Sequence, residues 1–362
     1  MISGDGRPDP YQAFQRGRLA VDQHMSKVLQ AEDMWAEETA TDILLTEAFP
    51  DVRYWKFTKR QESAVGADWL WWWIDTTGTS FGLLTQAKIL KRRGTGWHVD
   101  FGYRRRKTEP AQIDKLLVSS MTFSVPAAHV LYCGTPAYRA GLACGLTHHD
   151  GANCRDRERA GVSIVPSIIP HYLMPRVRDN VAVEAFHWSL PLEDVADPGR
   201  SQPPLPPLAA VHPDIAEFMR RPQLGARRVA KTMLEAVHSI RMGQFSAALS
   251  EDADDGVEDA VFTHLPSDRG HFGVPYLAHV LGGLRHRPPA YVQDLLAGRT
   301  PPTWVTDAVA GIVVIHDPEP AIQHLATPAG DGRMHPQRHL AVVHSDDREQ
   351  LPPAAVARSN SG

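Results

Sequence analysis

The sequences GADWLWWWID at residues 66–75 and FGLLTQAKIL at residues 81–90 decide the fold that we predict. Both runs are rich in apolar residues. The second is apolar on both faces until Gln86 and Lys88 interrupt one face, a pattern typical of a central strand that is covered on both sides. The residues between the two runs, TTGTS, have the composition of a turn. We therefore expect a β-hairpin in the core of an α/β domain.

Polar side chains are expected to gather at one end of this hairpin. Gln86 and Lys88 lie on the same side of their strand, because alternate residues of a strand point to the same face. If the hairpin folds symmetrically about Gly78, Asp68 lies opposite Lys88 and diagonal to Gln86, within the spacing of neighbouring side chains. A register slip of one residue would separate the three groups. The sequence thus predicts a carboxylate, an amide oxygen and an ammonium at one edge of the sheet.

A helix over residues 20–49 is expected to add a further carboxylate. Projected at about 100° per residue from Trp35, Glu38 and Asp42 share the apolar face, whereas Glu37 falls on the opposite side. A carboxylate on a core-facing stripe is costly unless it is paired or binds a metal ion. We therefore expect Glu38 to belong to the site, and Asp42 and Glu37 to be structural.

The chemistry of these side chains favours a divalent cation. Glu38, Asp68 and Gln86 offer hard oxygen ligands, which suit Mg²⁺ or Mn²⁺. Lys88 would orient and activate the attacking water and stabilise charge on a phosphate, as in metal-assisted phosphodiester hydrolysis. Taken singly, each of these residues also fits a structural role, as a turn cap or an ion pair.

Positive charge follows the hairpin directly. From Lys88 to Lys107 there are eight Lys or Arg residues against one acid, Asp100, in a chain whose net charge is −4. Aromatic residues are interleaved, so the segment would hold a phosphate backbone and stack on bases. The alternative is a solvated hairpin without a ligand. The residues predicted to bind nucleic acid are Lys91, Arg92, Arg93, Arg104, Arg105, Arg106 and Lys107.

The order of helix Glu, then GxD, then a hairpin to QxK resembles the PD-(D/E)xK nuclease superfamily. The resemblance is closest to the branch in which Gln replaces an acid, as in Mrr-type restriction endonucleases and related anti-phage defence nucleases. The matching positions are Glu38 in EETATD, Asp68 in GADW, and Gln86 and Lys88 in QAK. These strings are also similar to a bacterial family of uncharacterised proteins that we place in this superfamily. Ala67 stands where the superfamily usually has a proline.

The resemblance covers roughly residues 20–175. It implies a restriction-endonuclease-like α-β-β-β-α-β core, dependence on Mg²⁺ or Mn²⁺, and cleavage of a nucleic-acid backbone, with DNA favoured over RNA. It also suggests a role in bacterial anti-phage defence, an expectation that rests on analogy alone. The main alternative is a non-catalytic nucleic-acid-binding or scaffold protein that retains the nuclease fold. A partner protein from a defence system, or a second copy of the chain, stays open.

The remaining sequence sets the expected domain organisation. With 362 residues, 43% hydrophobic and 22% charged, the chain has the composition of a soluble globular protein. We divide it into an N-terminal extension (1–19), a nuclease-like domain (20–197), a proline-rich linker or crossover (198–213), a mixed, mostly helical C-terminal region of unknown role (214–345) and a disordered tail (346–362). Three cysteines favour a reducing, cytoplasmic location. Two of them lie with histidines in residues 144–154, at spacings that match no standard zinc finger.

Overall fold

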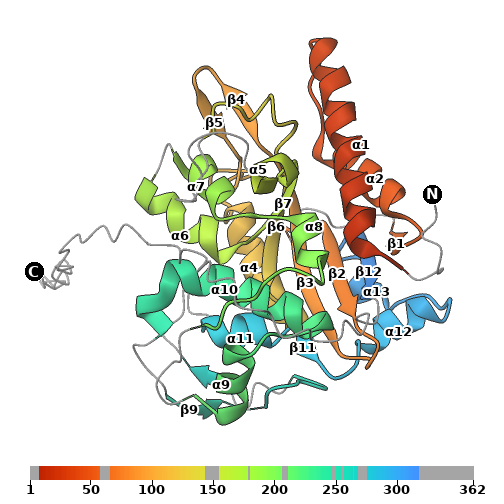
Figure 1. Ribbon diagram of the computed structural model, residues 1–362, viewed down its shortest axis with the longest axis vertical. Coiled ribbons are helices and arrows are strands. Elements are labelled where there is room, and N and C mark those ends of the chain that lie inside the picture. The colour runs from red at the N-terminus through yellow and green to blue at the C-terminus, as the bar shows by residue number, and fades with distance from the viewer. Residues whose placement is uncertain are drawn as a thin grey trace, which may run out of the picture.

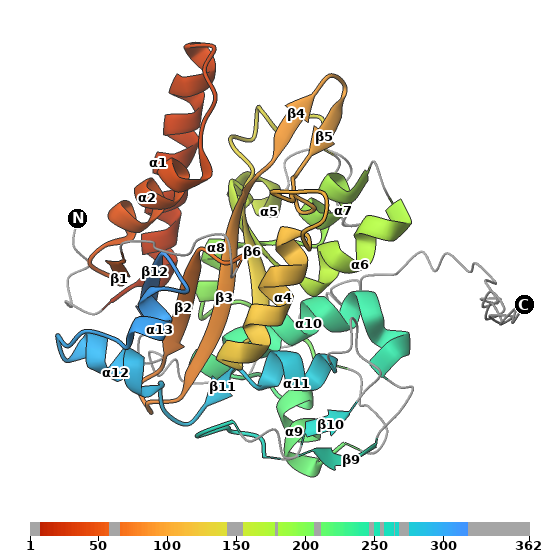
Figure 2. The same ribbon diagram turned by 180° about the vertical axis from the view of Figure 1, so that it is seen from behind.

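The chain folds around one mixed β-sheet with helices packed against both faces, as the computed structural model shows (Figures 1 and 2). The structure describes residues 8–57, 66–142, 155–177, 180–205, 211–245, 250–253, 257–263, 265–267 and 275–317. Within these residues the sheet has eight strands. In spatial order they are β1 (Val52–Lys56), β12 (Gly311–His316), β2 (Trp69–Ile74), β3 (Ser80–Ile89), β6 (Ala127–Tyr132), β7 (Val162–Pro166) and β8 (Leu190–Pro191), with β11 (Leu284–Arg285) paired to β3.

Different helices cover the two faces of the sheet. One face carries α1 (Pro10–Gln30) and α2 (Glu37–Ala48), and Phe14 of α1 stacks on Trp71 of β2 with ring centroids 5.8 Å apart. The other face carries α4 (Gln112–Phe123) and α11 (Tyr276–Leu281) (Figure 2). The other described helices are α5 (Arg155–Arg159), α6 (Ile168–Val177), α7 (Val181–His187), α8 (Leu192–Ala196), α9 (Pro213–Arg220), α10 (Gly225–Phe245), α12 (Ala290–Leu296) and α13 (Thr303–Thr306). Two small hairpin sheets pair β4 (Lys91–Arg93) with β5 (Gly96–His98), and β9 (Ser250–Ala253) with β10 (Leu265–Ser267).

The β2–β3 hairpin forms as predicted, but its register differs from the symmetric one. Trp69 pairs with Thr85, where symmetry about Gly78 would have paired it with Ala87. The turn is centred on Thr77 instead of Gly78, because the Asp75 carboxylate accepts hydrogen bonds from the backbone N–H groups of Thr77 and Thr79, at 2.9 and 3.1 Å. A shift of two residues keeps every side chain on its predicted face.

The predicted single helix over residues 20–49 is wrong, because the segment contains two helices. Helix α1 begins at Pro10, where the Asp9 side chain caps it, so much of the expected N-terminal extension is helical. It ends at Gln30, and Glu32 adopts a positive φ of 54° that a helix does not tolerate. Helix α2 starts only at Glu37, and Trp35 therefore belongs to neither helix.

The C-terminal part of the chain completes the main sheet. Strand β12 lies between β1 and β2, antiparallel to the first and parallel to the second. The described part of the proline-rich segment packs against neighbouring elements: Gln202 donates to the Arg228 carbonyl at 3.0 Å, and the Leu205 N–H donates to the Met219 carbonyl at 3.0 Å. Residues before and after the segment 198–213 thus contribute strands to the same sheet.

Some sequence expectations fall where the structure gives no description. Residues 144–154, with their cysteines and histidines, and the expected tail at 346–362 both lie outside the described residues. Among the helices that are described, none is long and apolar enough to span a bilayer.

Candidate active site

Asp68 lies just before strand β2, and its carboxylate accepts a hydrogen bond from a backbone N–H of β3. The β2 ladder starts at Trp69, and the preceding chain turns away at Gly66, whose φ is 71°. A backbone N–H of β3 beyond the ladder needs another acceptor. The Asp68 carboxylate supplies it and accepts from Ala87 N–H at 2.9 Å, while the Asp68 N–H donates to the Thr85 carbonyl at 2.9 Å. Asp68 is thereby held over β3, beside Gln86.

Gln86 is fully buried, with one end of its amide fixed and the other end open. Its Nε2 donates to the Gly66 carbonyl at 2.7 Å, and a carbonyl can only accept, so the orientation of the amide is determined. Its Oε1 has no hydrogen-bond partner among the described residues. A buried amide oxygen without a partner is costly, and it is a ready oxygen ligand.

Lys88 lies where helices from both faces of the sheet meet the end of β3. Its side chain is 6% exposed, and Nζ donates to Oε1 of Gln112, at the start of α4, at 2.9 Å. Nζ is also 3.8 Å from Oε2 of Glu37, the first residue of α2. The ammonium is therefore held between a neutral amide and a carboxylate, largely shielded from water.

The structure corrects the predicted helix face. The buried stripe of α2 runs through Thr41 and Leu44, and Glu37 continues it at the N-terminal end. The Thr41 hydroxyl donates to the Glu37 carbonyl at 2.9 Å and accepts from the Tyr132 hydroxyl at 2.8 Å, which holds this face against the sheet. Glu38, expected on the core-facing side, is exposed. The projection failed because it extrapolated helical geometry to Trp35 and Phe49, which lie outside α2.

Among these residues, Glu37 is the carboxylate whose pKa its surroundings raise. Burial raises its pKa, and the neighbouring carboxylates of Asp68 and Glu38 raise it further, whereas Lys88 opposes the shift. The two neighbouring carboxylates thus disfavour the charged form of Glu37. A bound cation would relieve that repulsion.

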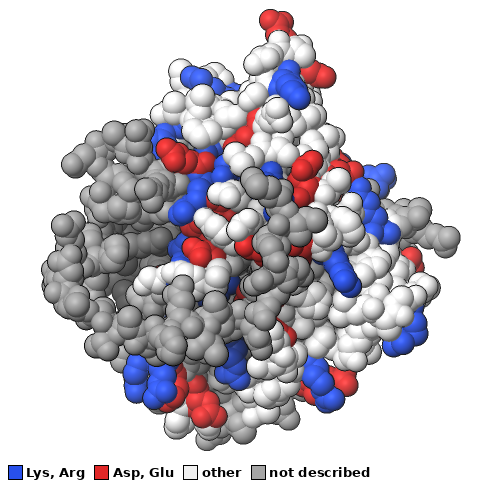
Figure 3. Space-filling view, turned by 45° about the vertical axis from the view of Figure 1, so that its right-hand side comes forward, with Lys and Arg blue, Asp and Glu red and all other residues white. Residues whose placement is uncertain are grey.

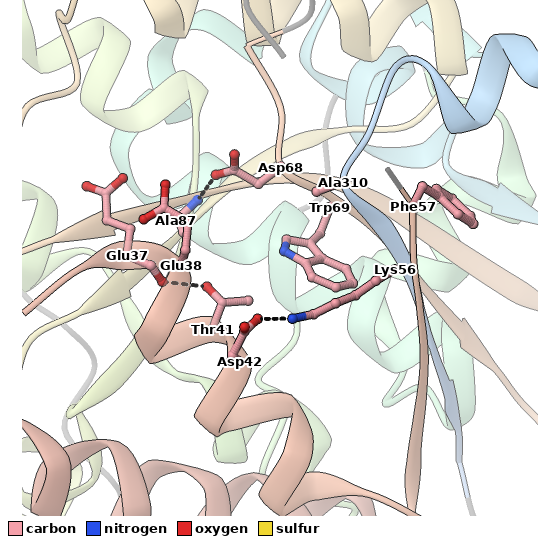
Figure 4. Close-up of a pocket in the computed structure, with 10 residues that line it drawn as sticks. All are labelled: Glu37, Glu38, Thr41, Asp42, Lys56, Phe57, Asp68, Trp69, Ala87 and Ala310. Carbon is pink, nitrogen blue, oxygen red and sulfur yellow. Dashed lines mark hydrogen bonds and ion pairs between the residues drawn. The ribbon is translucent and has the colours of Figure 1, made fainter. Parts of the chain in front are cut away.

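A cavity of about 210 Å³ opens between α2 and the start of β2 (Figure 4). The close-up places the side chains of Glu37, Glu38 and Asp68 at one side, and the Asp42–Lys56 ion pair, with an N–O distance of 2.5 Å, at the other. The lining residues are Glu37, Glu38, Thr41, Asp42, Lys56, Phe57, Asp68, Trp69, Ala87 and Ala310. Gln86 and Lys88 are not among these lining residues. They lie on the α4 side of β3, and Asp68 lies at the edge between the two sides.

The donors partly fit a divalent metal ion. No group of three or more His, Cys, Asp or Glu residues in the described chain is placed to hold one ion together. Mg²⁺ does not require such a group, since it typically takes one or two carboxylates and keeps several waters. Asp68, the unpartnered Gln86 Oε1, and Glu37 or Glu38 are donors of this hard type.

The predicted basic residues line two exposed segments beside this site. Lys91, Arg92 and Arg93 form β4, and Arg104–Lys107 lie in the loop between β5 and α4; all seven are exposed. The hairpin is anchored by Tyr138, whose hydroxyl accepts from Arg92 N–H at 2.9 Å and donates to the Leu90 carbonyl at 3.2 Å. The β4–β5 hairpin projects from the same end of the molecule as the C-terminal end of α1 (Figures 1 and 2). On the face shown in Figure 3, by contrast, acidic and basic side chains alternate, and neither sign forms a continuous patch among the coloured residues.

Three further residues belong to the surroundings of the site, and sequence reasoning missed them. His129 is fully buried beside Gln86 and bonds to Ser167, and Gln112 holds Lys88. Burial lowers the pKa of His129 well below its usual value, and the charge of Lys88 lowers it further, so the ring is neutral. The only sequence signal was the place of His129 in an apolar strand-like run, HVLYC, because its pairing partner β3 is distant in the chain.

Comparison with known proteins gives a family for the chain. No curated protein matches it. A family model described as "Family of unknown function (DUF6615)" matches residues 14–321, a span that runs from α1 past the end of β12. One family model thus spans both the N-terminal strands β1, β2 and β3 and the C-terminal strand β12. Since the match covers most of its length, the chain belongs to the DUF6615 family of unknown function.

Proposed function

We propose that this protein is a metal-dependent nuclease that hydrolyses phosphodiester bonds of nucleic acid, DNA more readily than RNA. The observation that carries the proposal is the meeting of Asp68, Gln86 and Lys88 at one end of the β2–β3 hairpin, with Glu37 of α2 3.8 Å from the lysine. In metal-assisted hydrolysis, a carboxylate and an amide oxygen can bind the metal ion, and an ammonium can stabilise negative charge on the phosphate.

The order of elements supports the finer fold in this proposal. Helix α2, strands β1, β2 and β3, helix α4 and strand β6 follow one another along the chain, with only the small β4–β5 hairpin between β3 and α4. This order matches the α-β-β-β-α-β core of the PD-(D/E)xK superfamily. Strand β12 between β1 and β2 is a departure from a simple meander of the first three strands.

Each residue has a role that follows from its position. Asp68 and Gln86, together with Glu37 or Glu38, would hold Mg²⁺ or Mn²⁺, which when bound supplies Lewis-acid stabilisation of a phosphate. Lys88 lies in a largely dry position, where a charge acts more strongly than in water, and would orient water toward the phosphate. The exposed basic residues of β4 and of the loop between β5 and α4 hold the nucleic-acid backbone.

The test is cleavage of plasmid, single-stranded DNA and RNA by the full chain in Mg²⁺, in Mn²⁺ and in EDTA. Metal-dependent cutting should fall at least about 100-fold in Lys88→Ala and in Asp68→Asn. Arg299→Ala is the control, because Arg299 is exposed, pairs with Asp294 and is not among the residues that line the cavity. It should stay within about three-fold of the unmodified protein.

The result also decides between classes of protein. If the protein binds nucleic acid but does not cut it in any metal, the nuclease proposal fails and the binding or scaffold alternative takes its place. A role in anti-phage defence and a cytoplasmic location remain parts of the proposal that rest on the resemblance and on the cysteine content.

A further inference from the structure

Two buried polar atoms without partners belong to neighbouring positions of the sheet. Gln86 and His129 are register partners on the parallel strands β3 and β6, and both side chains are fully buried. Neither Gln86 Oε1 nor His129 Nε2 has a hydrogen-bond partner among the described residues. Register partners lie roughly 5 Å apart across a sheet and point to the same face, which is within reach of a hydrogen bond between their side chains.

The hydrogen bond at the other ring nitrogen decides what His129 can offer to Gln86. Ser167 Oγ lies 2.9 Å from His129 Nδ1. A neutral imidazole has one N–H donor and one bare acceptor nitrogen. If the serine hydroxyl donates to Nδ1, the proton is on Nε2 and faces an amide oxygen that needs a donor. The opposite tautomer would place a bare nitrogen against that oxygen, two acceptors together in a dry site. Complementarity therefore selects the first arrangement.

The ring is also held in place by packing. Phe101 meets it edge to face, with ring centroids 4.9 Å apart, and the Ser167 N–H donates to the Ala127 carbonyl of β6 at 2.9 Å. At its other end, the Gln86 amide is bound to Gly66. The terminal torsion of a glutamine is soft, so a small rotation lets Oε1 approach Nε2.

We propose that His129 is a positioning residue: held by Ser167, it donates from Nε2 to Gln86 Oε1 and fixes the direction of that oxygen. An amide oxygen has two lone pairs, so one takes the histidine proton and the other stays free for a cation. This inference rests on the proposed function, in which Gln86 Oε1 is a metal ligand. Groups that orient a ligand in this way typically change metal affinity 10- to 100-fold when they are removed.

The first measurement is Mn²⁺ binding to the full chain by titration calorimetry, which needs no turnover. His129→Phe keeps a ring against Phe101 and removes the donor, and it should weaken Mn²⁺ binding about 10- to 100-fold. His129→Gln places an N–H near the former Nε2 and should restore affinity to within about three-fold. Ser167→Ala, which removes the partner of Nδ1, should give a Mn²⁺ affinity between those of the two His129 variants.

A double-mutant cycle separates positioning from general damage to the core. In a Gln86→Ala background, the change His129→Phe should cost no further Mn²⁺ affinity, because the oxygen that it orients is gone. Equal losses in both backgrounds would overturn the inference. So would unchanged Mn²⁺ affinity in both His129→Phe and Ser167→Ala.

A second measurement without metal keeps this inference distinct from the proposed function. In protein labelled with ¹⁵N at glutamine, the side-chain amide signals of Gln86, identified by their loss in Gln86→Ala, should shift in His129→Phe and return in His129→Gln. Signals that do not move would overturn the hydrogen bond. If they move while the unmodified protein binds no Mn²⁺, the hydrogen bond stands and the proposed metal site fails.

Discussion

Two buried clusters of charge in this molecule are organised differently. Where α1 packs against α8, each carboxylate meets a guanidinium: Arg18 Nε is 2.7 Å from Glu193, and Arg159 and Arg200 lie 3.1 and 3.0 Å from Asp194. At the end of the β2–β3 hairpin, Glu37 lies 3.8 Å from the ammonium of Lys88, which is bound to an amide as well.

We interpret this difference as one between a structural role and the functional role that we propose. Buried charges that are paired and hydrogen-bonded hold elements together, and the first cluster joins the N-terminal helix to the segment after β8. The second cluster places Glu37 3.8 Å from the Lys88 ammonium, without a guanidinium, and leaves Gln86 Oε1 with no hydrogen-bond partner among the described residues, a cost in stability that marks a candidate binding site. We therefore expect mutations in the first cluster to change stability, and mutations in the second to change binding and activity.

The largest expected effect is on stability, from Arg18→Met. The change keeps the aliphatic bulk of the side chain but leaves the carboxylate of Glu193, which is 1% exposed, without its closest partner. Breaking a buried pair from one side costs about 3–5 kcal/mol. Urea unfolding followed by tryptophan fluorescence measures it. Arg16→Met is the control, because Arg16 pairs with Asp51 at the surface of the same helix. A loss below about 1 kcal/mol for Arg18→Met would show that this cluster is not structural.

The pH dependence of stability should show the second largest effect, through Asp22 in the first cluster. Burial raises the pKa of Asp22 to about 6, although Arg139 and Arg18 oppose the shift. Because the folded pKa lies above the unfolded value, Asp22 adds stability below about pH 4, and this contribution is lost as the pH rises through 6. The full difference is at most about 3 kcal/mol. Asp22→Asn should flatten the stability profile between pH 4 and 7, and an unchanged profile would contradict the assignment.

A smaller effect should show which glutamate of α2 belongs to the site. Glu37→Gln should lower Mn²⁺ affinity about 10-fold, because Glu37 lies beside Lys88 and its pKa responds to Asp68. Its free energy of unfolding at pH 7 should not fall, since a carboxylate with a raised pKa does not stabilise the fold in its charged form. Glu38→Gln, which changes an exposed neighbour, should have less effect on Mn²⁺ affinity. The reverse ranking would return the ligand role to Glu38.

The accuracy of the sequence predictions depended on how local the determining contacts are. Patterns within about twenty residues predict the β2–β3 hairpin, the strand face that Gln86 and Lys88 share, and helix α4. The turn that Asp75 centres on Thr77 shifted the register by two residues, and each side chain still lies on its predicted face because side chains alternate along a strand. The place of β12 between β1 and β2 is set by contacts across more than two hundred residues, and no local pattern encodes it.

The predicted face of the helix was wrong for a different physical reason. Helical projection is sound only inside a helix, and the break before Glu37 moved the phase of the whole face. Likewise, His129 gained its place beside Gln86 from the parallel pairing of β3 with β6, which the sequence does not specify. Residues on one hairpin were therefore predictable, whereas those brought in by α2 and β6 were not.

The smallest expected effect concerns the exposed basic residues, each of which acts through screened charge. Arg92→Ala and Arg105→Ala should each weaken binding to a DNA duplex a few-fold at moderate salt. Each should also lower the slope of log K against log salt by about 0.9, the value for one phosphate contact. Arg299→Ala is the matched control, because Arg299 is an exposed arginine that follows α12, far from β4 and paired with Asp294 at 2.7 Å. Salt slopes that stay the same in all three variants would remove nucleic acid as the partner of this surface, since a phosphate contact cannot be lost without releasing fewer counterions.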